Sequence, residues 1–119
     1  MRLALAICAM LALGGPPQTL AHAFVDHAEP RVGSTVPSAP AEVRIWFTQE
    51  IESAFSTASV RDANGKRVNK SDSQVDPKDR TVLRVALETL PPGVYTVVWR
   101  VVSVDTHVSE GDFMFKVGQ

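Results

Sequence analysis

Apolar residues alternate with polar residues in several short segments of this chain, and clusters of turn-forming residues separate the segments. Because successive side chains of a β-strand point to opposite faces, a period of two predicts half-buried strands. The alternation is clearest in residues 43–47, 83–87 and 113–117. The pattern therefore favours an all-β fold with little helix.

The remaining segments fit the same reading. Residues 55–61 are predicted to be a strand, and Asn64-Gly65 after them is a strong hairpin signal. Residues 69–80 are polar and are predicted to be an exposed loop, whereas residues 94–104 are apolar on both faces and are predicted to be a central strand. About seven short strands with frequent turns predict an antiparallel β-sandwich.

Two aromatic residues on the long strand support a sandwich. Tyr95 follows the turn Pro91-Pro92-Gly93 and begins the strand, which is the position of a tyrosine corner, whose hydroxyl bonds to nearby backbone. Trp99 shares the strand parity of Tyr95, so we expect both side chains in the core.

Residues 1–21 are predicted to be a secretory leader: Arg2 precedes an apolar core that is too short to span a membrane. Two cleavage points fit, one before His22 and one before Phe24. Ala21-His22-Ala23 is the stricter match and favours cleavage before Phe24, but cleavage before His22 is preferred, partly because of the family resemblance given below, and the domain then spans residues 22–119. We expect this domain to be exported and soluble, without stable insertion in a membrane.

Charge and cysteine content exclude several functions. The chain has 12 Lys and Arg against 13 Asp and Glu, with no clustered basic surface of the kind that nucleic acid requires. Its one cysteine, Cys8, lies in the predicted leader. The domain therefore lacks the thiolate of a blue-copper centre, the attachment site of c-type haem and the ligands of a thiolate zinc site.

Three residues make a candidate copper site. As the first residue of the mature chain, His22 offers its α-amine and its Nδ1 as a chelating pair. Asp105 and His107 are two positions apart and point to the same side of an extended segment. Together they supply the nitrogen and oxygen donors that Cu(II) prefers in a tetragonal arrangement. Alternatively, His107 is a loop residue and Asp105 a turn former.

His27 is the third histidine outside the leader. In an extended segment it would point away from His22, which makes it a poor ligand for the same ion. It is expected on the surface or behind the ligands, and a weaker second site with Asp26 is the alternative.

The chain resembles the CopC copper-resistance family over the whole expected domain. The residues that carry the resemblance are His22-Ala23-Phe24, Glu29-Pro30, Gly33-Ser34, Ile45-Trp46-Phe47-Thr48, the run PGVYTVVWRVVSVDTH at residues 92–107, Gly111, Phe113, Phe115 and Val117.

The resemblance implies a Greek-key β-sandwich or barrel of the immunoglobulin-like or cupredoxin-like kind. It also implies a periplasmic location, Cu(II) binding through His22, Asp105 and His107, and delivery to an inner-membrane copper transporter of the CopD type. We expect a monomer with no enzymatic activity. Two departures stand out: Met114 is the one methionine outside the leader, and Gln49 replaces a glutamate that some members have near copper.

Two other functions remain open. One is a metal-free immunoglobulin-like interaction module, in which the three candidate ligands have no metal role. The other is a copper monooxygenase with an N-terminal histidine brace, although Asp105 would fill the copper position that such an enzyme keeps open.

Overall fold

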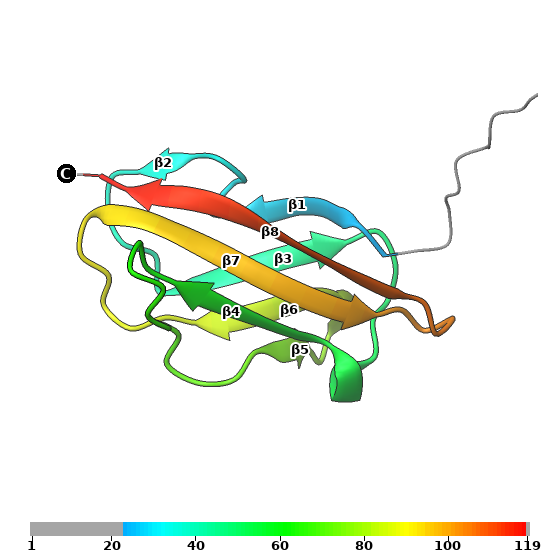
Figure 1. Ribbon diagram of the computed structural model, residues 1–119. Helices are drawn as coiled ribbons and strands as arrows, with labels where there is room; N and C mark the ends of the chain where they lie inside the picture. The colour runs from blue at the N-terminus through cyan, green and yellow to red at the C-terminus, as the bar shows by residue number, and fades with distance from the viewer. Residues whose placement is uncertain (1–22, 119) are drawn as a thin grey trace, which may run out of the picture.

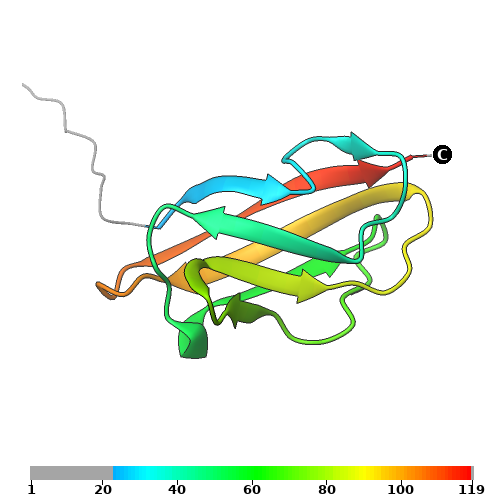
Figure 2. The same ribbon diagram turned by 180° about the vertical axis from the view of Figure 1, so that it is seen from behind.

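The computed structural model describes residues 23–118, so the expected leader and His22 lie outside the described range. These residues form two four-stranded sheets that pack face to face (Figures 1 and 2), which confirms the predicted all-β sandwich. In order across the first sheet lie β1 (Val25–Glu29), β3 (Glu42–Phe47), β6 (Asp79–Ala86) and β5 (Gln74–Asp76). Across the second lie β2 (Thr35–Val36), β8 (Val108–Val117), β7 (Gly93–Val102) and β4 (Thr57–Arg61).

The described residues thus contain eight strands, one more than the approximate number expected, and one pairing is not antiparallel. The short strand β2 runs parallel to the end of β8, through Thr35–Lys116 and Val36–Val117. All other strand pairs are antiparallel. No helix within residues 23–118 has the length and apolar character needed to cross a membrane.

The core lies between the two sheets and is made by the alternating segments. As predicted, the inward apolar residues of the three alternating segments are all buried. These segments correspond to β3, to β6 with the residue after it, and to β8. The inward residues are Val43, Ile45, Phe47, Leu83, Val85, Leu87, Phe113, Phe115 and Val117.

The long strand β7 behaves as its sequence predicts, because it lies between β8 and β4. The hydroxyl of Tyr95 donates a hydrogen bond to the Pro91 carbonyl, which confirms the tyrosine corner. Trp99 is buried, with its ring 5.2 Å from that of Phe47 in an edge-to-face arrangement. Both aromatic side chains are therefore core residues.

The predicted loop at residues 69–80 is wrong, because this segment contains β5 and the start of β6. Asn69 is buried, and its Oδ1 accepts a hydrogen bond from the backbone N–H of Val60 at 3.1 Å. The Ser73 hydroxyl likewise accepts from the N–H of Ala58 at 2.9 Å. Polar side chains of this segment accept hydrogen bonds from backbone N–H groups at the edge of β4. Their polarity therefore did not indicate an exposed loop.

The preceding segment differs in a smaller way. The strand predicted at residues 55–61 begins at Thr57, because Ser53–Phe55 forms a single 3-10 turn, η1. The turn signal at Asn64-Gly65 is confirmed: Gly65 has a φ of +83°, and the N–H of Asp62 donates to the Lys66 carbonyl.

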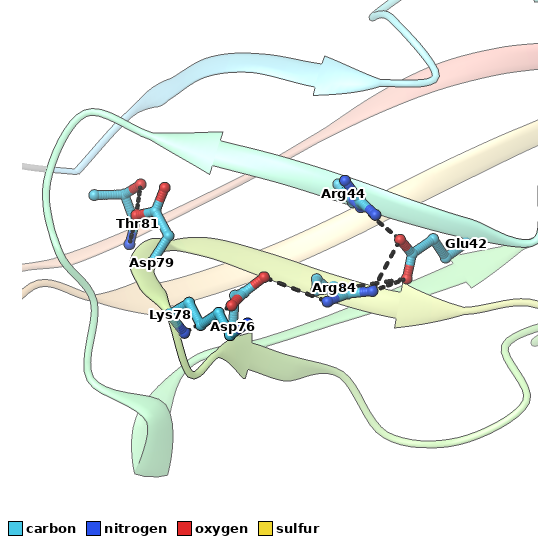
Figure 3. A network of polar contacts seen from close by, with 7 residues as sticks. All are labelled: Glu42, Arg44, Asp76, Lys78, Asp79, Thr81 and Arg84. Atoms are coloured by element: carbon cyan, nitrogen blue, oxygen red, sulfur yellow. Dashed lines mark hydrogen bonds and ion pairs between the residues drawn. The ribbon is translucent and has the colours of Figure 1, made fainter.

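A network of charged side chains covers the outer face of the first sheet (Figure 3). The carboxylate of Glu42 accepts hydrogen bonds from Arg44 and Arg84, and Arg84 also lies 3.3 Å from Asp76. Burial tends to raise the pKa of Glu42, but the hydrogen bonds from the two arginines outweigh burial and hold that pKa below its ordinary value. A hydrogen bond from the backbone of Lys78, together with Arg84, lowers the pKa of Asp76.

This network predicts how stability depends on pH. A carboxyl group whose pKa is lowered by folding stabilises the fold above its unfolded pKa, and the contribution is lost as the pH falls through the folded pKa. Replacing Glu42 with Gln should therefore lower the free energy of unfolding at neutral pH and make its acid-side decline shallower. Denaturant unfolding between neutral and acid pH measures both effects. The exposed Glu88 provides the control through Glu88→Gln, and parallel pH profiles for the two variants would contradict the prediction.

A second prediction concerns Gly111, which faces Trp99 across the β7–β8 ladder. A Cβ atom at position 111 would lie 2.8 Å from Cζ2 of the Trp99 ring. Gly111→Ala should therefore destabilise the domain by about 1–3 kcal/mol, as overpacking of a core does. In Gly93→Ala the new Cβ would meet only ordinary contacts at 3.7 Å or more, so this control should unfold close to the wild type. Equal unfolding midpoints for the two variants would contradict the prediction, because they would show that the Trp99 ring can move aside without loss of stability.

Candidate metal centre

Asp105 and His107 lie in the loop that joins β7 to β8. The loop is closed at its base by two backbone hydrogen bonds: Ser103 N–H to the His107 carbonyl at 2.9 Å, and Thr106 N–H to the Ser103 carbonyl at 2.8 Å. Thr106 has a φ of +72°, a left-handed conformation that tightens the turn. The chain therefore reverses direction between the two candidate ligands.

The reversal brings the two side chains together. Nδ1 of His107 lies 3.2 Å from Oδ1 of Asp105, and the two side chains are 50% and 42% exposed. They were predicted to share a side because the segment would be extended. They do meet, but a tight turn is the cause.

The donor set fits a borderline divalent metal ion. Imidazole nitrogen and carboxylate oxygen are both ligands that such ions take in proteins. Nδ1 of His107 and Oδ1 of Asp105 face each other at 3.2 Å, the separation of an ion pair, so the two groups lie close to one point. No group of three or more His, Cys, Asp and Glu side chains suited to a metal ion occurs within residues 23–118. The described residues thus contribute two donors at this loop.

Asp105 is held in its charged form. The hydrogen bond from the Ser103 hydroxyl and the contact with His107 lower the pKa of the Asp105 carboxyl, and partial burial opposes them only in part. The carboxylate is therefore ionised at neutral pH and available as an anionic oxygen donor.

The beginning of the described chain lies at the same end of the sandwich as this loop, in both views (Figures 1 and 2). The N–H of Phe24 donates to Thr48 Oγ1 at 3.0 Å, and the N–H of Thr48 donates to the Phe24 carbonyl at 2.8 Å. A hollow of about 380 Å³ is lined by Phe24 and Trp99 together with Val108, Ser109 and Glu110. Residue 24 therefore lies near the start of β8, the strand that follows His107 in the sequence. His22, two residues earlier, lies outside the described range.

The segment after β3 runs along the other side of the loop. The N–H of Val104 donates to the Glu50 carbonyl at 3.1 Å. The Glu50 carboxylate lies 3.9 Å from Arg80, and Glu52 lies 3.7 Å from the same guanidinium. Glu50 is thus paired with Arg80 of β6.

His27 takes no part in this pair. Its ring stacks on Trp46 at 4.3 Å between centroids, and its Nδ1 lies 2.7 Å from Asp26. A bulge between Val25 and His27 breaks the alternation of β1, so the parity argument used to separate His27 from His22 does not hold. The stacking on β3 keeps His27 on the outer face of the first sheet.

Sequence reasoning did not single out Ser103. It is fully buried, and its hydroxyl donates to Asp105 and lies 3.3 Å from the backbone nitrogen of His107. The available signal was one serine within the apolar run Val101-Val102-Ser103-Val104, two residues before the carboxylate. A polar residue on a buried strand face requires hydrogen-bond partners, and here Asp105 and His107 provide them.

Comparison with known sequences identifies related proteins. The profile of the CopC domain matches residues 25–118. Protein YobA of Escherichia coli K12 is 33% identical over 102 residues, which cover 85% of this chain and 82% of YobA. Copper transport protein CutJ of Bacillus subtilis is 32% identical over 105 residues, which cover 87% of this chain but 19% of CutJ.

Solved structures agree. CopC from Methylosinus trichosporium OB3b superposes with a TM-score of 0.76 and 31% identity, over 82% of this chain and 94% of that one. PcoC, a methionine-rich copper resistance protein from Escherichia coli, gives a TM-score of 0.70 and 30% identity, over 82% and 99% of the two chains. With the family profile spanning almost every described residue and these structures sharing its sandwich, the chain belongs to the CopC domain family.

Proposed function

We propose that this protein is a periplasmic Cu(II) carrier that binds one copper ion through His22, Asp105 and His107. The observation that carries the proposal is the contact between Asp105 and His107 on an exposed loop beside the point where the described chain begins. In this proposal residues 1–21 are removed as a leader, and residues 22–119 form the mature domain. The amine and imidazole of His22 then supply the donors that the loop lacks.

The donor chemistry favours Cu(II) over Cu(I). Imidazole, amine and carboxylate are donors that suit a tetragonal Cu(II) ion, whereas Cu(I) is selected by thiolate and thioether ligands. The relative PcoC is described as methionine-rich, but Met114 is the one methionine of this chain outside the expected leader. Met114 lies in β8, seven residues beyond His107, and is half exposed.

The same donor set favours binding and delivery over catalysis. Four protein donors would fill the equatorial plane of the ion and leave little room for a substrate. The relative named copper transport protein CutJ contains the matching region as a fifth of its length. The name of this relative supports a role in copper transport, and in our proposal a monomeric carrier delivers the ion to a membrane copper transporter of the CopD type.

Copper titration of single-residue variants tests the ligand set. The protein with a free His22 amine should bind one equivalent of Cu(II) and give a tetragonal electron paramagnetic resonance spectrum with nitrogen couplings. His107→Ala should weaken binding by more than the roughly 10–100-fold that loss of an outer-shell partner costs, because a direct donor is removed. The control is His27→Ala, which should keep wild-type affinity. If His107→Ala and His27→Ala bind copper equally well, the proposed site is wrong and a metal-free module becomes the better account.

The role of the amine has its own test. Adding one glycine before His22 converts the α-amine of His22 into an amide. An α-amine loses its proton near its ordinary pKa of about 8 and can then bind a metal ion, whereas an amide nitrogen is not basic. Copper affinity should fall steeply and the number of nitrogen couplings should drop. A protease site that releases the extension and restores His22 as the first residue provides the control, since affinity should return. Indifference to the extension would contradict the chelating role of His22.

A further inference from the structure

We propose that Ser103 is the positioning residue of the copper site, holding the Asp105 carboxylate and the His107 backbone so that both ligands are in place before the metal binds. The inference rests on the proposed function, because it concerns the same site. It assigns a role to a side chain that is itself too deeply buried to bind the ion.

Ser103 is buried in the core. Ser103 has 0% exposure and lies at the end of β7, among apolar neighbours such as Val101 and Ile51, which are also fully buried. Burying a hydroxyl group without a partner costs free energy, and an apolar residue of similar size would avoid that cost. A serine here is explained by what its hydroxyl contacts.

The hydrogen bonds of the Ser103 hydroxyl lead to both proposed ligands of the loop. The Ser103 hydroxyl has one proton, which it donates to Oδ1 of Asp105. Its oxygen lies 3.3 Å from the backbone nitrogen of His107, whose N–H it accepts. One side chain thus connects the carboxylate of one proposed ligand to the backbone of the other. A hydrogen bond of this kind orients a ligating carboxylate and tunes its basicity.

The backbone of the loop is held by hydrogen bonds that do not involve the Ser103 hydroxyl. The loop is closed by backbone bonds from Ser103 to His107 and from Thr106 to Ser103, and it is attached to the segment after β3 through Val104. None of these bonds uses a side chain. Removing the hydroxyl therefore leaves these three backbone bonds in place, removes the acceptor of the His107 N–H and frees the Asp105 carboxylate to rotate.

The chain contains a matched control. Ser56 is also buried, with 3% exposure, and its hydroxyl accepts the N–H of Val102 at 3.1 Å, at the base of the same loop. Ser56→Ala removes a hydroxyl of similar burial next to β7, and the hydrogen bond lost is one to the Val102 backbone. The two variants should lose comparable stability but differ in copper binding.

The experiment compares Ser103→Ala and Ser56→Ala in protein with a free His22 amine. Ser103→Ala should bind Cu(II) about 10–100-fold more weakly, as loss of an outer-shell partner does, and should shift the copper hyperfine coupling. Ser56→Ala should keep the wild-type affinity and spectrum. Ser103→Thr keeps the hydroxyl while perturbing the packing, so it should restore affinity even where its unfolding midpoint is lowered.

A double-mutant cycle with Asp105→Asn locates the effect. If Ser103 acts through Asp105, Ser103→Ala should cost much less affinity in the Asp105→Asn background than in the wild type. Wild-type affinity and spectrum for Ser103→Ala, or fully additive losses in the cycle, would overturn the assignment while leaving the copper site standing. Failure of the unsubstituted protein to bind Cu(II) would instead overturn the proposed function itself.

Discussion

The ladder between β7 and β8 is the constraint on which the rest of the structure depends. The two strands pair without a register shift from Gly93–Val117 to Val102–Val108, so the loop between them has a single possible position at the end of the sandwich. Because strand side chains alternate, this register also decides which residues of β8 face the core. It places Gly111 opposite Trp99, where the absence of a side chain makes room for the indole ring.

In the proposed copper site the loop supplies two donors, and the others come from the beginning of the mature chain. The reciprocal bonds between Phe24 and Thr48 fix the beginning of β1 to the end of β3, and the segment after β3 in turn supports the loop through Glu50. Residues about eighty positions apart in the sequence thus meet at one end of the sandwich. Stability and the geometry of the site therefore have the same origin, which is the pairing of strands that carry no ligand.

Much of this could be predicted from the sequence, because alternation directly reflects burial. The strand segments, the tyrosine corner and the inward position of Trp99 followed from periodicity and turn residues. The segment at residues 69–80 could not be predicted this way. The side chains of Asn69 and Ser73 accept hydrogen bonds from the backbone of β4, and although these bonds span fifteen residues or fewer, they form only because the fold places the segment beside β4. The bulge at the start of β1 was equally hidden, although the surface position expected for His27 agrees with its exposed side chain.

Asp105 and His107 were predicted to lie together because the segment was expected to be extended, but in the structure a tight turn brings them together. An extended segment and a tight turn both place residues two apart on one side, so the sequence spacing could not distinguish them. Ser103 was overlooked because a lone serine in an apolar run has no periodic signal. Its role depends on the turn, which brings the Asp105 carboxylate back to the Ser103 hydroxyl.

Ala23 bears on where the mature chain begins. Its side chain is fully buried within the hydrophobic core, although it precedes the first strand. Removal of this residue during export would open a void at the end of the sandwich and would leave a charged ammonium group where the Phe24 amide now donates to Thr48. The packing of this one small side chain therefore supports the proposed processing before His22 over processing before Phe24.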